Sequence, residues 1–409
     1  MATRNASSAA GRRTLALRRA LGPALPDRPF AVAFWDGGTL PATREPVATF
    51  AVRSSAAIAH LLRAPGQLGL VRAYVSGGLD VDDLDAVMEL LDTWKPPTIG
   101  PVERVRLGLA AARAAGVQAP ATPQVELRPR GPRHSPARDA RAVRHHYDVS
   151  NDFFALFLDA SMTYSCGIFS EGARTLEEAQ AAKRALICTK LRLGQDDRVL
   201  DVGCGWGSFA VQAATEHGAQ VTGITLSAPQ AEVARARAEA AGVADRVDIR
   251  VADYRDLAGE RFDAIASIGM VEHVGEPRAD EYALRLAALL RPGGRLLNHG
   301  IARLRHTRAA PGPFSERYVF PDAVPLHLSR VLLALERAGF ETHHVEGFAP
   351  DYAETLRHWA ERLDARRDEA ERLAGAERVR VWRLYLRAAR NGFQNGFTSI
   401  YQVRSSLRS

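Results

Sequence analysis

The chain has 409 residues, of which 46% are hydrophobic, so it is longer than one typical domain and can bury a sizeable core. No apolar run is long enough to span a bilayer, which predicts a protein that is soluble or peripheral to a membrane. The net charge of +7 favours a polyanionic partner, either nucleic acid or an anionic membrane surface, although surplus arginine on a solvated face explains it equally well.

The chain begins with a basic segment, residues 1–26, that carries five arginines and no acidic residue. It lacks the long apolar stretch of a signal peptide, and we interpret it as a partly helical basic arm. Residues 27–115 predict a first domain, with a strand, a helix and then two helices around a Gly77-Gly78 turn. Residues 116–140 contain five prolines and little apolar periodicity, which is typical of a linker.

From residue 141 to residue 409 the pattern changes to alternating strands and helices. Strands are predicted at 197–203, 220–226, 247–253, 262–269 and 295–301, and helices at 208–218, 229–242 and 280–294. They are followed by a helix at 323–339, a strand at 341–348, a helical region at 352–390 and a last strand at 399–406 that can be antiparallel. This alternation predicts an α/β fold with a doubly wound parallel sheet, whose ligand crevice lies at the carboxyl ends of the strands.

The segment VLDVGCGWGSFA at 199–210 is the strongest local signal. A strand ends at Asp201, glycines at 203, 205 and 207 let the backbone turn and approach a ligand closely, and a helix begins near Ser208. Such glycines also fit a dinucleotide site, in which a helix N-terminus meets a pyrophosphate. The acid before the first glycine resembles motif I of class I S-adenosylmethionine-dependent methyltransferases, whose ligand carries a sulfonium and an amino group but no phosphate.

Two later strand ends agree with this ligand. Asp253 follows the third strand, where methyltransferases commonly hydrogen-bond the adenine amine, and Tyr254 is an aromatic neighbour. The end of the second strand lacks the usual ribose-binding acid and reads GITLSAPQ instead. Thr225, Ser227 and Gln230 supply uncharged hydrogen-bonding groups there.

This GxTLSxxQ pattern resembles one family, the cyclopropane-fatty-acyl-phospholipid synthases and the related mycolic acid methyltransferases. The segments that follow in that family's order are HYDVSNDFFALFLDASMTYSCGIF, DVGCGWG, DYRDL, SIGMVEHVG, PGGRLLNHGI, YVFPDAVP and PDYAETLRHW. LGLVRAYVSGG and DVDDL in the first domain are similar to the bacterial synthases more loosely. The resemblance implies a Rossmann-like, seven-stranded methyltransferase sheet with a smaller N-terminal α+β domain, and S-adenosylmethionine as co-substrate.

The resemblance also implies the residues of the site. The cofactor-binding positions are Tyr164, Ser165, Asp201, Gly203, Cys204, Gly205, Gly207, Thr225, Leu226, Ser227, Gln230, Asp253 and Tyr254. The catalytic positions, which surround a bound bicarbonate, are Cys166, Ile268, Glu272, His299 and Tyr352. His299 rests on aligning RLLNHGI with a Leu-Leu-His-Thr-Ile pattern, which puts Asn298 at a leucine position. His273, beside Glu272, is interpreted as a supporting partner.

The implied reaction explains these residue types. A cis alkene in an acyl chain is a poor nucleophile, so the rate depends on holding it against the methyl sulfonium in a dry pocket. Attack leaves a carbocation, and one proton of the added methyl group must leave as the ring closes. Bicarbonate can act as that base and needs a socket with a histidine donor, a tyrosine hydroxyl and Glu272. Taken alone, Cys166 predicts buried packing, and Tyr352 also fits a packing aromatic at a helix start.

We therefore expect a cyclopropane-fatty-acyl-phospholipid synthase. The nearest alternative shares the first step and gives a methylene- or methyl-branched chain. A nucleic-acid methyltransferase fits the charge, but the chain has no base-flipping signature and no recognisable RNA-binding module, so no nucleic-acid partner is expected. A non-catalytic lipid-binding relative predicts damaged cofactor glycines or a missing Glu272, and all of these are intact.

The expected setting is the cytoplasmic face of a membrane. Residues 27–115 and the linker are predicted to dock on anionic lipid, each basic contact contributing about 1 kcal/mol. The linker arginines are Arg128, Arg130, Arg133, Arg138, Arg141 and Arg144. Three cysteines without paired spacing argue against disulfides and a zinc site, so no metal is expected and a reducing cytoplasm fits best. The sequence leaves open the lipid, the double-bond position, a homodimer and the order of the N-terminal arm.

Overall fold

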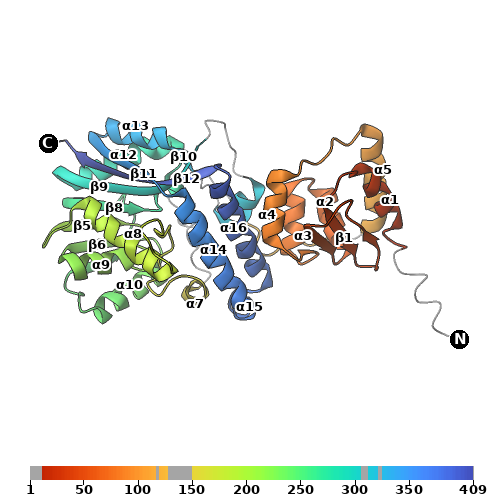
Figure 1. The fold of residues 1–409 in the computed structure, drawn as a ribbon. Helices are drawn as coiled ribbons and strands as arrows, with labels where there is room; N and C mark the ends of the chain where they lie inside the picture. Colours follow the sequence, from red (N-terminus) through yellow and green to blue (C-terminus); the bar gives the residue numbers. More distant parts are fainter. Residues whose placement is uncertain (1–11, 117–118, 128–149, 305–311, 321–324, 409) are drawn as a thin grey trace. The chain divides into compact units, whose positions relative to one another are not determined.

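The chain forms two compact units, which are considered separately (Figure 1). The computed structural model describes residues 12–116, 119–127, 150–304, 312–320 and 325–408. The smaller unit comprises the described residues up to 127 together with Gly312–Val319 and Gly375–Ala388, and the larger unit comprises the rest. Two segments from the C-terminal half therefore group with the N-terminal residues, which the predicted boundaries at 27–115 and 141–409 do not include. The arginines of the predicted linker lie outside the described residues.

The smaller unit is an α+β fold built on a four-stranded sheet with the order β2-β1-β3-β4. β1 and β3 are parallel, and the other two pairs are antiparallel. The strands are β1 (Phe30–Phe34), β2 (Thr39–Leu40), β3 (Ala48–Val52) and β4 (Leu79–Val81). The helices are α1 (Leu15–Ala24), α2 (Ser55–Arg63), α3 (Gln67–Val75), α4 (Leu84–Thr93) and α5 (Pro101–Ala115). Leu17 of α1 is buried in the same apolar cluster as Phe34 and Ile58, so part of the predicted basic arm is a helix in this core.

A buried glutamate ties segments of the smaller unit together. Glu126 accepts hydrogen bonds from Arg72 at 2.6 and 2.7 Å, from Arg317 at 2.8 Å and from the Tyr318 hydroxyl at 2.7 Å. Its side chain is fully buried. Burial opposes ionisation, but the hydrogen bonds from Arg72, Tyr318 and Arg317 outweigh it and lower the pKa of Glu126 to about 2. This network holds Gly312–Val319, which contains the π-helix η2 (Ser315–Val319), within the unit.

The larger unit is built on a sheet with the strand order β11-β12-β9-β8-β5-β6-β7, to which β10 adds a short parallel pairing with β9. The strands are β5 (Arg198–Val202), β6 (Gln220–Thr225), β7 (Val247–Val251), β8 (Phe262–Ile268), β9 (Leu290–Arg303), β10 (Leu326–His327), β11 (Phe340–Gly347) and β12 (Thr398–Leu407). β12 runs antiparallel to both of its neighbours, and the other pairs are parallel. The predicted doubly wound sheet and the antiparallel last strand are confirmed.

Helices cover both faces of this sheet (Figure 1). Val199 faces a cluster formed with α8, α9 and α10, whereas Leu200 and Val202 face a cluster formed with α12 and α13. Successive side chains of a strand point to opposite faces, and a strand buried on both faces is therefore apolar throughout. The helices of the larger unit are α7 (Asn151–Ala155), α8 (Leu176–Leu191), α9 (Ser208–His217), α10 (Ala228–Ala240), α11 (Val271–Val274), η1 (Glu276–Arg278), α12 (Ala279–Leu289), α13 (Leu328–Arg337), α14 (Ala349–Ala365) and α15 (Arg367–Ala374). Most of α16 (Ala376–Gln394) groups with the smaller unit.

One predicted boundary was wrong: the helix predicted at 280–294 ends at Leu289, and its last residues begin the long strand β9. The helical region predicted at 352–390 is confirmed, and it is divided into three helices at Arg366 and at Gly375, whose φ of 80° favours a residue without a side chain. Apolar spacing alone did not show these breaks because the flanking segments are all amphipathic.

Substitution of Glu126 by Gln should destabilise the smaller unit by about 3–5 kcal/mol, because it leaves Arg72 buried without its counter-charge. The lowered pKa also predicts how stability depends on pH. The contribution of Glu126 to the free energy of unfolding is complete above its ordinary pKa of 4.5 and is lost as the pH falls toward 2. Urea-induced unfolding of the full chain at pH 7 measures the loss. Glu45→Gln, at an exposed position, is the matched control, and equal stability of the two variants would contradict the prediction.

Candidate active site

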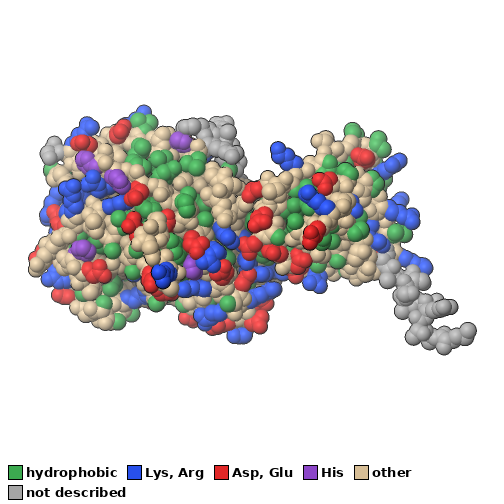
Figure 2. All heavy atoms as spheres, viewed as in Figure 1, with side chains coloured by type: hydrophobic (Ala, Val, Ile, Leu, Met, Phe, Trp, Pro, Cys, Tyr) green, Lys and Arg blue, Asp and Glu red, His purple; other side chains and the backbone are tan. Residues whose placement is uncertain are grey.

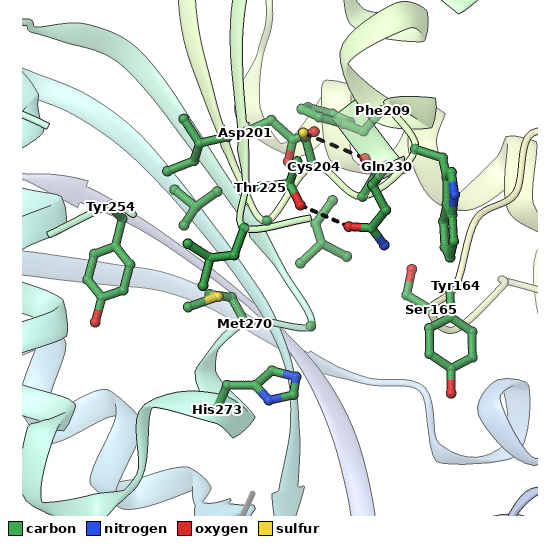
Figure 3. Close-up of a pocket in the computed structure, with 18 of the residues that line it drawn as sticks. Tyr164, Ser165, Asp201, Cys204, Phe209, Thr225, Gln230, Tyr254, Met270 and His273 are labelled. Atoms are coloured by element: carbon green, nitrogen blue, oxygen red, sulfur yellow. Dashed lines mark hydrogen bonds between the residues drawn. The ribbon is translucent and has the colours of Figure 1, made fainter. Parts of the chain in front are cut away.

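A pocket lies at the carboxyl ends of β5, β6, β7 and β8 (Figure 3). Its walls are the turns that follow these strands, and residues 162–165 lie across from them. In the close-up, Tyr164 and Ser165 lie on the opposite side from Tyr254, and Met270 lies between them. The position agrees with the crevice expected at the carboxyl ends of parallel strands.

The glycines after β5 serve two purposes. Gly203 and Gly205 line the pocket with φ values of 80° and 54°, and a Cβ at Gly205 would meet no protein atom within 4 Å. The backbone at Gly205 is therefore open to a ligand. A Cβ at Gly207 would lie 2.9 Å from Cβ of Ala234 in α10, so this glycine permits α9 and α10 to pack closely. Gly207 does not line the pocket.

Hydrogen bonds fix the residues after β6. Thr225 Oγ1 donates to Gln230 Oε1 at 2.8 Å and accepts from Ser227 N at 3.2 Å. The Gln230 amide oxygen is thereby engaged, so its NH₂ group is the end left to face the pocket (Figure 3). Ser227 caps α10 by accepting from Gln230 N, and it does not line the pocket.

The residues after β7 line the pocket on its other side. Asp253 is engaged by Arg255, whose Nε and backbone N reach one carboxylate oxygen at 2.9 Å and whose Nη2 reaches the other at 2.6 Å. Tyr254 packs edge-on against Tyr282 at 5.6 Å between ring centroids. Burial raises the pKa of Tyr254 to about 12, so its hydroxyl is neutral at pH 7.

Sequence analysis missed Lys183, a buried lysine of α8 that lines the pocket. Its Nζ donates to Ser165 Oγ at 2.6 Å. Burial lowers the pKa of Lys183 to about 7 and raises the pKa of Asp201 to about 7, while the attraction between the two opposite charges acts against both shifts. The signal was present in the sequence, because Lys183 occupies an apolar position of α8 between Ala179 and Ile187, both of them buried.

Glu272 comes from the short helix α11, immediately after β8 breaks at Gly269 with a φ of 71°. Its Oε1 accepts a hydrogen bond from Ile301 N in β9 at 2.7 Å. Its Oε2 is buried and has no hydrogen-bond partner among the described residues. Burial raises the pKa of Glu272 to about 7, so its charge changes near neutral pH. Ile268, at the end of β8, lines the pocket.

His299 lies on β9, beside Ile268 of β8 in the parallel register. Its Nδ1 lies 3.3 Å from Gln402 Nε2, and its Nε2 is buried without a partner among the described residues. Burial lowers the pKa of His299 well below its ordinary value, so the ring is neutral. Asn298, which departs from the expected leucine, accepts from the Tyr282 hydroxyl at 2.9 Å.

Three further residues complete the predicted set. Cys166 is fully buried, its Sγ donates to Gly167 O at 3.1 Å, and burial raises the pKa of its thiol well above the ordinary value. A neutral, buried thiol fits packing and no covalent role. Tyr352 is buried on α14, with its ring 4.7 Å from that of Phe393. His273 lines the pocket, and burial lowers its pKa to about 4.

The structure thus gathers most of the predicted cofactor positions into one pocket. The predicted positions that line it are Tyr164, Ser165, Asp201, Gly203, Cys204, Gly205, Thr225, Leu226, Gln230, Asp253 and Tyr254. Of the predicted catalytic positions, Ile268 lines this pocket, and the other four are buried residues outside its lining. An elongated ligand with a charged end near Lys183 and an aromatic end near Tyr254 would fit such a lining.

Known proteins share this sequence and fold. Residues 134–403 match the sequence profile of the mycolic acid cyclopropane synthetase family. A probable fatty acid methyltransferase of Mycobacterium tuberculosis, Rv3720, is 40% identical over 364 residues, which are 86% of this chain and 85% of the relative. The cyclopropane-fatty-acyl-phospholipid synthase of Escherichia coli is 33% identical over 339 residues, which are 83% of this chain and 82% of that protein.

A solved structure shows the same architecture. The mycolic acid cyclopropane synthase CmaA1, crystallised with S-adenosylhomocysteine, is 32% identical and superimposes with a TM-score of 0.62 over 65% of this chain and 98% of its own. The Rossmann-like methyltransferase fold and S-adenosylmethionine as co-substrate are confirmed by this likeness. The chain belongs to the mycolic acid cyclopropane synthetase family and is an S-adenosylmethionine-dependent methyltransferase.

Proposed function

We propose that this enzyme is a cyclopropane-fatty-acyl-phospholipid synthase, which adds one carbon to a cis double bond of a phospholipid acyl chain and closes it into a ring. The observation that supports this most directly is a pair of buried, unpartnered polar atoms. Glu272 Oε2 and His299 Nε2 both lack a hydrogen-bond partner among the described residues. Buried polar atoms are nearly always satisfied, so such a pair indicates a polar ligand.

The first proposed step is binding of S-adenosylmethionine by the pocket. An ammonium group only donates, so Ser165 Oγ accepts from Lys183 and its own proton is free to donate into the pocket. Ser165 and Lys183 together suit the carboxylate of the methionine part, and Asp201 suits the amino group. Tyr254 and Asp253 lie where the adenine would extend, and Gly203 and Gly205 allow the backbone to approach it. Gly207 and Ser227 would act through α9 and α10.

Lys183→Met should weaken S-adenosylhomocysteine by about 10- to 100-fold, because a hydrogen bond from a charged group contributes about 1.5–3 kcal/mol. It should leave 5′-methylthioadenosine binding within about twofold, because that ligand lacks the amino-acid group. Isothermal titration calorimetry measures both. Equal weakening of the two ligands would show that Lys183 only supports the fold.

The proposed chemistry starts when the π electrons of the alkene form a bond to the methyl carbon. The carbon–sulfur bond breaks and its electrons remain on sulfur, which leaves S-adenosylhomocysteine and a carbocation on the chain. A proton then leaves the added methyl group, and the electron pair of that C–H bond closes the ring. Water would trap the cation, so the reaction needs a dry site, and Glu272 and His299 are both buried.

The two unpartnered atoms fit a bound bicarbonate. Bicarbonate carries both a negative oxygen and a hydroxyl, and when bound it supplies a base for the departing proton. His299 Nε2 can donate to the oxygen, and Glu272 Oε2 can accept from the hydroxyl. The bond from Ile301 N holds the Glu272 carboxyl in place. Cys166, Ile268 and Tyr352 are the other predicted residues of this socket.

Expression in bacteria that lack cyclopropane lipids should yield cyclopropane fatty acid methyl esters, identified by the ring protons in proton NMR. Glu272→Gln should lower ring formation at least about 100-fold, as expected for a group that supports proton transfer, while S-adenosylhomocysteine still binds. Glu336→Gln, at an exposed position of α13, is the matched control. Full activity of the Glu272 variant would overturn its proposed role.

A second product deserves the same measurement because of the 40% identity to a probable fatty acid methyltransferase. After methyl transfer, a hydride shift moves the cation to the carbon that bears the new methyl group, and loss of a proton from that methyl group gives a methylene-branched chain. Both products gain one CH₂, so mass alone does not separate them. An olefinic CH₂ signal in place of ring protons would assign this function instead.

We also propose that α5 docks the smaller unit on an anionic bilayer. Val102, Val105 and Leu109 are 67%, 63% and 57% exposed, and their spacing places them on one face of the helix. At 100° per residue, Arg106 and Arg113 fall on the same face, and both are exposed. The opposite face, which includes Ala110, Ala111, Ala114 and Ala115, is buried. An exposed helix face that combines apolar and basic side chains is typical of attachment to anionic lipid.

The neighbouring helix α1 adds to this basic surface. α1 packs against α5, and the exposed residues at this end of the chain include Arg12, Arg13 and Arg19. Figure 2 shows basic and apolar side chains together around these two helices. Among the described residues, no helix is long and apolar enough to cross a membrane. The exposed apolar and basic side chains of α5 are what support attachment at the surface.

Replacing Val102, Val105 and Leu109 together by Ser should lower co-sedimentation with phosphatidylglycerol vesicles at least about tenfold, because each buried apolar side chain contributes about 1.5–3 kcal/mol. Arg106→Gln with Arg113→Gln should remove the dependence on anionic lipid and on salt. Leu284→Ser, at a 55% exposed position of α12, is the control. Unchanged vesicle binding, or a dimer that becomes a monomer in the triple variant, would assign this face to another role.

A further inference from the structure

Gln402 of β12 is fully buried and joins two groups that the sequence does not connect. It lies opposite His299 in the register of β12 and β9. Its Oε1 lies 2.6 Å from Lys190 Nζ, and its Nε2 lies 3.3 Å from His299 Nδ1. Lys190 also forms an ion pair with Glu346 of β11, which anchors the far end of the chain of contacts.

The charge of Lys190 sets the direction of these hydrogen bonds. An ammonium has no acceptor, so the oxygen of the Gln402 amide must face Lys190 and its NH₂ group must face His299. An NH₂ group only donates, so His299 Nδ1 must accept and carries no proton. The ring is neutral, and its single proton therefore lies on Nε2, the buried atom without a partner among the described residues.

We propose that Gln402 and Lys190 are positioning residues that hold His299 as the Nε2–H tautomer, so that it donates a hydrogen bond to an oxyanion beside Glu272. This inference deepens the proposed function, because bicarbonate is the oxyanion in question. The opposite tautomer would present a lone pair to that oxygen and repel it. We call the contacts Glu346–Lys190–Gln402–His299 the relay. Sequence motifs do not reveal it, because its members come from β11, α8, β12 and β9.

The test is the tautomer of His299 in the protein without substrate. Two-bond proton–nitrogen NMR spectra of the ¹⁵N-histidine-labelled enzyme distinguish the two tautomers, and the His299→Asn variant identifies the signal. We expect the Nε2–H form in the unmodified chain. In Gln402→Glu the carboxylate only accepts, so the proton should move to Nδ1 or the ring should become doubly protonated. An Nδ1–H form in the unmodified chain, or an unchanged signal in Gln402→Glu, would overturn the inference.

A matched control and a second readout separate positioning from support of the fold. Ser405→Ala removes a cross-strand contact with Thr342 from a buried position of the same strand, and it should leave the tautomer unchanged. If the proton moves to Nδ1, Gln402→Glu should raise the bicarbonate concentration for half-maximal activity at least tenfold and leave S-adenosylhomocysteine affinity within twofold, whereas a doubly protonated ring keeps its Nε2 donor and should not raise that concentration. An equal loss of cofactor affinity would indicate a structural role instead.

These readouts also separate the inference from the proposed function. The tautomer is measured without substrate or product, so the result depends only on the contacts of Lys190, Gln402 and His299. If the unmodified enzyme forms no cyclopropane and does not respond to bicarbonate while the tautomer shifts as expected, the relay holds and the proposed reaction fails. Lys190→Met should give mixed tautomers, because the Gln402 amide is then free to turn over, and a single unchanged Nε2–H form would count against the role of Lys190.

Discussion

Two lysines of one helix set the direction of the hydrogen bonds around Ser165 and Gln402. Lys183 and Lys190 lie on α8, two turns apart, and each points its charge into the interior. A buried ammonium must find acceptors, since leaving it unpaired costs several kcal/mol. Lys183 finds Ser165, and Lys190 finds Gln402 and Glu346. Because an ammonium cannot accept, Lys190 assigns the donor and acceptor ends of the Gln402 amide and, through it, of His299.

α8 can play this part because its ends are fixed. Thr175 and Glu178 form a capping box at its start, and Arg192 ends it in the left-handed conformation with a φ of 50°. Between these ends, apolar residues at every third or fourth position hold one face against the sheet. The lysines share that face, so their side chains reach the pocket and β12 respectively. The free energy gained by packing the apolar residues offsets the cost of burying the two charges.

The fold and most of the cofactor pocket could be predicted because both depend on short continuous stretches of the sequence. Alternating strands and helices gave the sheet, and the glycine turn, the Thr225 segment and Asp253 each directly follow a strand. Gln402 could not be predicted, because its partners Lys190 and His299 are distant in the sequence. Lys183 was marked in the sequence only by its apolar position on α8, and its partner Ser165 lies on another segment. Ser227 and Gly207 belong to the predicted cofactor motifs but do not line the pocket. Ser227 caps α10, and Gly207 lets α9 and α10 pack closely beside the pocket.

In the reaction that we propose, the choice between a ring and a branched chain depends on how rigidly the proton acceptor is held. Both proposed routes share the carbocation, and the ring forms when the added methyl group loses its proton before a hydride shift moves the cation. Glu272 is held at one oxygen by Ile301 N, and His299 is held at Nδ1 by Gln402, so each has one atom without a partner among the described residues and little freedom to turn. The proposed bicarbonate, held between these two atoms, would accept a proton from one direction only. A site built this way favours one product, and the identity of that product depends on where the alkene lies along the rim of β8 and β9.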